Sequence, residues 1–263
     1  MKHFLLAAFL LLFINVWGQN KIAVDFRKAV LSDTFYTQDY TDKTSHSSDL
    51  NLLWTTTNNQ YIVGYIGKNY QRIRIKFLSV TKDSANPKLY HVVGKSMVKN
   101  IVCTFRGTLA ITLIKRYIGV DGCEDDSSSL PQKEEYCIIG NYHFEENRNL
   151  PNTGIFEGIF ASKLFLDKNG SPLYNADTLD ICSDGYGNNQ FAGTWTSFSS
   201  KAQKVCMWGD FRVPFPDDLD VGAGEFSPNP KYLQYGWQTY SDAYDGETPN
   251  AKALKAEEAE WWK

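Results

Sequence analysis

The chain has 263 residues, of which 43% are hydrophobic and 14% aromatic, so it is long enough to bury a large core in one main domain. Its formal net charge of -3 provides no broad positive field, which argues against nucleic acid as a partner. The acidic balance is typical of a surface that favours solubility.

The first eighteen residues have the pattern of a secretory signal peptide. Lys2 and His3 precede an apolar run over residues 4–16, and Val16 and Gly18 are the small residues expected just before a cut at Gln19. The run is too short to cross a bilayer comfortably, and no later segment is apolar for long enough. The sequence therefore predicts a secreted or periplasmic protein with no integral membrane segment after cleavage.

Residues 19–58 are predicted to be an irregular lead-in to the main domain. Within them, Ile22, Phe26, Ala29 and Val30 recur at helical spacing, which predicts a short amphipathic helix over 21–31. Residues 32–50 are rich in Ser, Thr, Asp and Tyr and show no sustained periodicity.

Residues 59–246 are predicted to form a β-barrel-like domain, in which strand patterns begin at about Tyr61 and follow one another at a spacing typical of hairpins. The predicted strands are 61–67, 70–81, 89–98, 101–117, 135–145, 154–166, 190–198 and 204–213. In the second, apolar residues alternate with basic ones, namely Ile73, Ile75 and Phe77 with Arg72, Arg74 and Lys76. We predict an all-β fold in which an antiparallel meander of about eight to ten strands closes into a barrel or a strongly curled sheet, with short peripheral helices.

A Phe-x-Gly pattern occurs in three of these strands, at residues 105–110, 156–161 and 191–196. A period of two places each Phe and Gly on one face with a large apolar residue, which is Leu109, Phe160 or Trp195. Glycine within a strand allows a sharp bend or the close approach of another backbone. The pattern therefore favours a barrel.

Five cysteines in a secreted chain allow two disulfides and one remaining thiol. We predict that Cys123 pairs with Cys137 and Cys182 with Cys206, leaving Cys103 free. The alternatives are that all five are reduced, or that Cys103 pairs with one of the others. No C-x-x-C spacing indicates a zinc site or a redox centre.

The late part of the chain is loop-like but aromatic-rich. Residues 214–249 include Tyr235 and Trp237, and we expect these aromatic loops to lie near the mouth of the barrel. A C-terminal helix is predicted within 247–263, with Thr248 as its N-cap and Pro249 at its first position. This helix would carry Trp261 and Trp262.

The segment Gly193-Thr194-Trp195 resembles the Gly-x-Trp signature of the calycin barrels, the lipocalin and avidin group. In that family the Trp closes one end of the barrel near a basic residue. The family carries the motif on its first strand, whereas here it lies late in the chain. The resemblance implies a barrel in which Trp195 plugs one end and Arg212 stacks on it as a cation–π partner. It implies no particular ligand.

Alternation along residues 208–212 places Trp208, Asp210 and Arg212 on one face of a strand. Such a face could form a small polar and aromatic site, in which Arg212 offers a planar donor fork to a carboxylate or to sugar hydroxyls. The alternative is an Asp–Arg pair that fixes the strand end before Pro214. With the other aromatic candidates, the predicted ligand-binding residues are Trp195, Trp208, Asp210, Arg212, Tyr235 and Trp237.

Other polar groups carry weaker hypotheses. Arg106 and Glu157 occupy the same slot of two Phe-x-Gly segments, so they would face each other if those strands paired in that register. Two carboxylates such as Glu157 and Asp210 could serve a glycan hydrolase.

Two groups of acidic residues are candidates for calcium. They consist of Asp180, Asp184, Asn188 and Asn189, and of Asp217, Asp218, Asp220 and Glu225. Neither matches an EF-hand loop, and turns favour the same residues for local hydrogen bonds. We predict no bound metal at either group and no cofactor, since no dinucleotide or phosphate-binding fingerprint is found.

An excess of aromatic residues remains, with seven Trp, fifteen Tyr and sixteen Phe. Flat rings combined with amide and carboxylate groups suit sugars and lipophilic molecules, although β-rich cores also use many aromatics. The leading hypothesis is a non-enzymatic protein that binds a small molecule or glycan. The alternatives are a carboxylate-dependent hydrolase acting on glycans and a structural, envelope-associated protein; the oligomeric state stays open.

Overall fold

The structure is a computed structural model that describes residues 21–33, 36–41, 49–117, 134–167, 169–174, 186–246, 248 and 250–263. Among these residues, no helix is both long and apolar enough to cross a membrane. The segment predicted as a signal peptide lies outside the described residues.

Ten strands form one antiparallel sheet, and the regular segments follow the predicted ranges closely. The strands are β1 (Tyr36–Asp39), β2 (Ile62–Ile66), β3 (Gln71–Lys82), β4 (Leu89–Val98), β5 (Ile101–Tyr117), β6 (Glu134–Glu146), β7 (Gly154–Leu166), β8 (Pro172–Tyr174), β9 (Asn188–Ser197) and β10 (Gln203–Asp210). The helices are α1 (Lys21–Ser32), α3 (Gln238–Tyr244) and α4 (Ala251–Glu258), with 3-10 turns η1 (Asn51–Trp54), η2 (Asn59–Tyr61) and η3 (Pro230–Tyr235).

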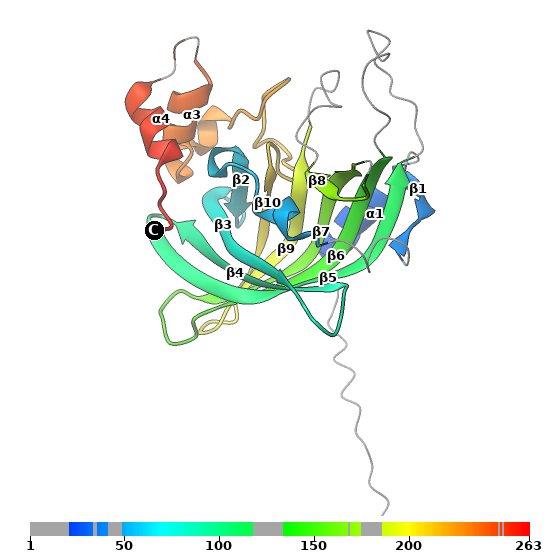
Figure 1. Cartoon of the computed structure of the whole chain (residues 1–263). Coiled ribbons are helices and arrows are strands. Elements are labelled where there is room, and N and C mark those ends of the chain that lie inside the picture. Colours follow the sequence, from blue (N-terminus) through cyan, green and yellow to red (C-terminus); the bar gives the residue numbers. More distant parts are fainter. Residues whose placement is uncertain are drawn as a thin grey trace, which may run out of the picture.

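The sheet closes on itself as a barrel-like ring (Figure 1). Neighbouring strands run in the order β5, β4, β3, β2, β10, β9, β7 and β6, and β6 pairs back with β5 over eleven residue pairs. The short strands β1 and β8 extend the edges of β5 and β7. The predicted all-β antiparallel meander is therefore confirmed, because consecutive strands are neighbours around most of the ring.

Glycines within the strands allow neighbouring backbones to approach closely. Gly158 of β7 lies directly opposite Gly193 of β9, and a Cβ on Gly193 would lie 2.0 Å from the carbonyl oxygen of Glu157. No real side chain tolerates such a distance, so the two backbones approach this closely only because both residues are glycine. The predicted role of the Phe-x-Gly segments is confirmed.

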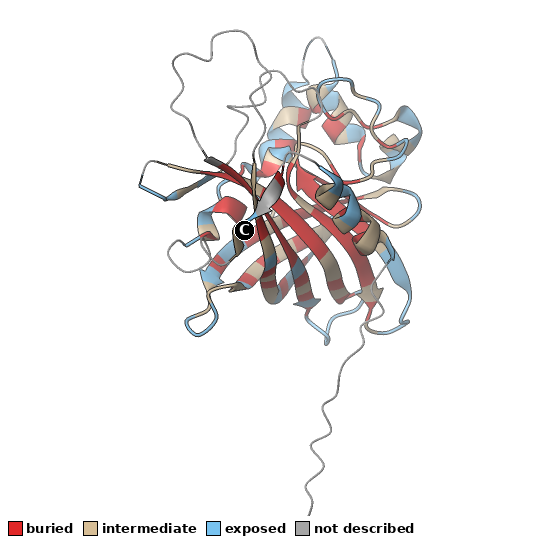
Figure 2. Cartoon of the chain, turned by 90° about the vertical axis from the view of Figure 1, so that its right-hand side faces the viewer, coloured by how far each residue is buried: buried red, intermediate tan, exposed pale blue. Residues whose placement is uncertain are grey.

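Aromatic side chains fill the middle of the barrel. Phe105, Phe144, Phe191 and Trp208 point inward and are almost fully buried, and the rings of Phe191 and Trp208 stack with centroids 4.7 Å apart. Figure 2 shows buried residues along the strands and exposed residues in the turns and on the outer sides of the helices. An aromatic pair of this kind adds about 0.5–1.5 kcal/mol beyond the area that it buries.

A second apolar cluster covers part of the outer face of the ring. Helix α1 packs Ala23 and Phe26 against β7 and β9. Of the apolar face predicted for it, Phe26 is buried and Ile22 and Val30 are half-buried, whereas Ala29 is exposed. On another side, α3 and α4 lie together (Figure 1), with Trp237 and Tyr240 buried against the sheet. The expectation that Trp237 lies at the barrel mouth is therefore wrong, because this side chain is core.

Helix α4 begins two residues later than predicted and ends at Glu258, so it does not carry Trp261 and Trp262 as expected. Its N-cap is Asn250, whose Oδ1 accepts hydrogen bonds from the amides of Lys252 and Ala253. Thr248 is not the N-cap, since an Asn side chain already satisfies these first amides. Pro249 lies outside the described residues.

The cysteines of the described part of the chain are free. Cys137 and Cys206, each predicted to form a disulfide, are fully enclosed thiols, and Cys103, predicted to be unpaired, is free as well. Burial raises the pKa of Cys137 to about 12 and that of Cys206 well above its ordinary value, which keeps both protonated. Neither predicted disulfide is present; the expected partners Cys123 and Cys182 lie outside the described residues.

Candidate functional site

A cavity of about 740 Å³ opens at one end of the barrel. Four turns meet at this end, namely those between β2 and β3, β4 and β5, β6 and β7, and β9 and β10. We call it the turn end. Inside the mouth, the inward-facing residues of these strands form the wall of the cavity, among them Ile73, Val98, Ile101, Phe156 and Trp195.

Glu146 is the polar centre of this cavity. Its Oε1 accepts a hydrogen bond from the Ser96 hydroxyl at 2.7 Å. Its Oε2 accepts one from the backbone N–H of Gly154 at 2.9 Å and one from the Trp195 indole N–H at 3.0 Å. Three donors from three other strands thus hold a buried carboxylate in one orientation, on a wall that combines apolar and polar side chains.

Positive charge gathers at the mouth. Lys68, Lys99 and Lys204 line the cavity, and Lys204 Nζ lies 5.6 Å from the centre of the Trp195 ring. The turns over residues 67–70, 99–100, 147–153 and 198–202 contain basic residues and no acidic one. Since the chain as a whole carries a net charge of -3, this end has the opposite sign to the whole molecule.

The thiol of Cys103 also lies on the cavity wall. Its side chain is mostly buried, and burial together with the charge of Glu146 raises its pKa. The thiol is therefore protonated at neutral pH, so it does not act as a nucleophile in the cavity at that pH.

The opposite end of the barrel is closed around Asp210. Oδ2 of this residue accepts hydrogen bonds of 2.7 Å from Thr57, Tyr174 and Asn189, and Asn189 also donates to the Leu53 carbonyl of η1. Complete burial raises the pKa of Asp210 to about 6, although these hydrogen bonds and the charge of Lys76 act in the opposite direction. The space left beside it is about 20 Å³, too small for an organic ligand.

The six residues predicted to bind a ligand do not form one site. Trp195 and Tyr235 line the turn-end cavity, whereas Asp210 lies at the closed end. Trp208 belongs to the packed interior, and Trp237 to the outer cluster, where its indole N–H donates to the Tyr70 carbonyl at 2.7 Å. Of the six predicted residues, Trp195 and Tyr235 therefore line the cavity.

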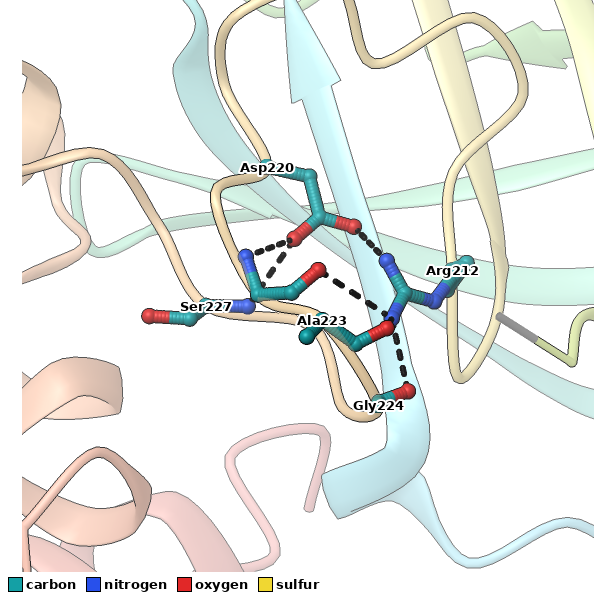
Figure 3. A network of polar contacts seen from close by, with 6 residues as sticks. Arg212, Asp220, Ala223, Gly224 and Ser227 are labelled. Carbon is teal, nitrogen blue, oxygen red and sulfur yellow. Dashed lines mark hydrogen bonds and ion pairs between the residues drawn. The ribbon is translucent and has the colours of Figure 1, made fainter. Parts of the chain in front are cut away.

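The Arg212 side chain lies outside the barrel, against the loop that contains Asp220 (Figure 3). The left-handed backbone of Phe211, with φ of 66°, interrupts the alternation after Asp210, so Arg212 does not share a face with Trp208. It pairs with Asp220 and donates to the carbonyls of a loop, at 3.1 Å for Ala223 and 2.6 Å for Gly224. The predicted Arg212–Trp195 stacking is therefore wrong, as is the alternative Asp210–Arg212 pair.

Arg106 and Glu157 do not face each other, because β6 lies between their strands. Across the ladders, Arg106 is opposite Glu145, and Glu157 is opposite His143. Burial raises the pKa of Glu157, with the His143 charge acting in the opposite direction. Glu157 lies on the outer face of the sheet and Asp210 on the inner face, so the geometry gives no support to these two as a hydrolase pair.

The described residues do not form a calcium site. Within the described ranges there is no cluster of three or more His, Cys, Asp or Glu able to hold a metal ion. Asn188 and Asn189 are buried and hydrogen-bonded, while Asp180 and Asp184 lie outside the described residues. In the second group, Asp218 pairs with Lys231 and Asp220 with Arg212.

Sequence reasoning missed Glu146 and Ser96. Phe144 faces the core, and strand alternation puts Glu146, two residues later, on the same face. Ser96 shares a face with Val98, two residues further along β4. A charged residue in phase with the core at a strand end was therefore a signal, but a pair such as Glu145-Glu146 resembles a solvated turn.

Comparison of the chain with protein-family models, with curated proteins and with solved structures finds no match. The resemblance to the calycins thus reaches no further than a barrel-like antiparallel sheet, with Trp195 near one of its ends.

Proposed function

We propose that the protein is a non-enzymatic binding protein that holds a small, largely apolar molecule with an acidic group in the turn-end cavity. The observation that carries the proposal is the cavity itself, whose volume of about 740 Å³ lies within the range of about 300–1,000 Å³ common for ligand pockets. Aliphatic and aromatic side chains supply the wall. Polar side chains such as Ser96, Glu146 and Asn152 lie on the same wall and could orient a bound molecule.

The lysines at the mouth support an acidic group on the ligand. Lys68, Lys99 and Lys204 lie where a ligand with its apolar body inside would place its outer end. An elongated molecule with one carboxylate or sulfonate matches both the wall and the rim. The apolar wall favours this class over a glycan, whose hydroxyls require many directed hydrogen bonds.

The test is a titration of the full chain with a neutral solvatochromic dye, followed by displacement with a medium-chain fatty acid and, separately, with oligosaccharides. We expect saturable dye binding with one site, displacement by the fatty acid and none by the oligosaccharides. Absence of binding by the dye, the fatty acid and the oligosaccharides would contradict the proposal.

A matched pair of variants tests whether the dye binds inside the turn-end cavity. Val98 points into the cavity, and Val102 points outward from the neighbouring strand of the same hairpin. Val98→Trp fills the cavity and should abolish dye binding, whereas Val102→Trp should leave it unchanged. Equal binding by the two variants would place the dye elsewhere.

Export to the periplasm or outside the cell is part of the proposal, supported by the leader-like pattern of residues 2–19. Expression with this segment in a Gram-negative host should yield a mature protein whose first residue is Gln19. An uncleaved chain retained in the cytoplasm would count against it.

A further inference from the structure

A second cavity, of about 570 Å³, lies on the outside of the barrel between β3, η3 and the helices α3 and α4. Arg72 and Arg74 lie two residues apart on the outward face of β3 and line this cavity. Both side chains are more than nine-tenths buried. Thr239 of α3, Glu257 of α4 and Lys99 of the turn between β4 and β5 lie on other parts of its wall.

The charges in this cavity do not balance. Arg72 donates bidentately to Glu257, with Nη1–Oε1 and Nη2–Oε2 distances of 2.7 and 2.6 Å. Arg74 Nη2 donates to the main-chain oxygen of Glu257 at 2.6 Å and lies 3.8 Å from its Oε2. The ion pairs that both arginines make within the described chain are thus with one carboxylate, so two positive charges share one negative charge.

The hydrogen bonding is also incomplete. Arg72 Nε is buried and has no acceptor among the described residues, which is unfavourable for a charged donor. Burial and the neighbouring charge of Arg72 lower the pKa of Arg74 to about 10. Both features are those of a cationic site that lacks an anion.

Aromatic rings hold the two guanidinium groups in place. Arg72 lies over Trp237 and Tyr240, at 5.3 and 5.1 Å from the ring centres, and Arg74 lies 5.7 Å from that of Trp261. Stacking fixes planar donor forks without using their N–H groups. The donors therefore stay oriented whether or not an anion is bound.

We propose that this outer cavity binds a small oxyanion, with Arg74 as its main donor. A tetrahedral or planar oxyanion accepts the parallel hydrogen bonds that a guanidinium group offers. Phosphate, sulfate and carboxylate share this chemistry. The cavity shares Gln71 and Lys99 with the rim of the turn-end cavity, but Arg72 and Arg74 line only the outer one. Its test does not depend on the function proposed for the turn-end cavity.

The test is the melting temperature of the full chain in phosphate, sulfate or acetate, each compared with chloride at equal ionic strength. We expect at least one oxyanion to raise the melting temperature by about 2–4 °C over chloride. Preference for phosphate or sulfate over acetate would identify a tetrahedral anion, and the reverse a carboxylate. Arg74→Gln should remove the shift, whereas Arg106→Gln, which removes an exposed cation of β5, should retain it.

A second pair of variants tests the same proposal without replacing an arginine, in case Arg74→Gln fails to fold. Thr239→Glu places a carboxylate on the cavity wall, and Thr239→Gln places a neutral group of the same size there. We expect Thr239→Glu to melt higher than Thr239→Gln in chloride and to show no further rise with the oxyanion. Equal melting of this pair in chloride, or equal responses of wild type and Thr239→Glu to every anion, would overturn the proposal.

Discussion

Glu146 accepts hydrogen bonds from three donors that the cavity wall would otherwise leave without a partner. Glu146→Ala should therefore destabilise the fold by about 2–4 kcal/mol, because it leaves buried donors unsatisfied and removes packing. Urea unfolding measures this change. Glu145→Ala is the control: its side chain is the next along β6 but points to solvent, and it should cost less than about 0.5 kcal/mol. Equal costs would show that the three hydrogen bonds contribute nothing.

Asp210 makes stability depend on pH. Its pKa of about 6 in the folded chain exceeds the ordinary value of about 3.9 expected on unfolding, so the folded state binds this proton more tightly. The resulting stabilisation is complete below about pH 4 and is lost as the pH rises toward about 6. Asp210→Asn keeps an acceptor oxygen but does not titrate.

Relative to wild type, Asp210→Asn should therefore gain on the order of 2–3 kcal/mol in unfolding free energy between about pH 4 and pH 7. Denaturant unfolding at several pH values measures the difference between the two proteins. Asp242→Asn, at an exposed position of α3, should follow the wild-type profile. A constant difference between Asp210→Asn and wild type would show that the carboxyl has no raised pKa.

Single residues were predictable where strand alternation alone determined their side. Trp195 and Phe160 face the interior as predicted. Arg212 does not follow the alternation, because the positive φ of Phe211 reverses the chain just before it. Such a backbone conformation at a non-glycine residue leaves no clear signal in the sequence.

At the scale of the elements, the facing glycines Gly158 and Gly193 allow β7 and β9 to approach closely. Gly158→Ala should cost about 1–3 kcal/mol or more, because its Cβ would lie 2.2 Å from the Ala192 carbonyl oxygen and the strands would have to separate. Thermal unfolding measures the change. Gly246→Ala is the control, since its Cβ would meet only ordinary contacts at 3.6 Å. A Gly158→Ala protein as stable as the control would refute the role assigned to the facing glycines.

The strands themselves were predictable, and their neighbours less so. Alternation located β4, β5 and β7 to the residue, because a buried face runs along most of each strand, although a bulge between Ile111 and Leu113 shifts the alternation near the end of β5. The Arg106–Glu157 pairing failed because two strands with the same motif need not be adjacent. Local pattern does not encode which strands pair across the ring.

Over the whole molecule, the two ends of the barrel differ. At one end, η1 and the side chains that are hydrogen-bonded to Asp210 fill the interior. At the other, the strands extend beyond the packed aromatic layer and enclose the 740 Å³ cavity. This asymmetry could not be predicted from the sequence, because it depends on strand tilt and on which side chains from different strands reach the same level.

The distribution of charge follows the same asymmetry. The turn end is basic although the chain is acidic overall. Sequence reasoning used the net charge and so missed it, because the four turns come together only in the folded chain. An acidic ligand would be attracted to the mouth, with an association rate that falls as salt is added.

The most direct test of the cavity as a binding site is the rate at which Cys103 reacts with a small alkylating reagent, with and without the fatty acid identified in the displacement assay. A chain carrying Cys123→Ser and Cys182→Ser leaves Cys103 on the cavity wall and Cys137 and Cys206 enclosed in the fold. Alkaline pH compensates for the raised pKa of Cys103. The account predicts that the rate falls in proportion to the fraction of protein with ligand bound. An unchanged rate at saturating ligand would show that the ligand lies outside the turn-end cavity.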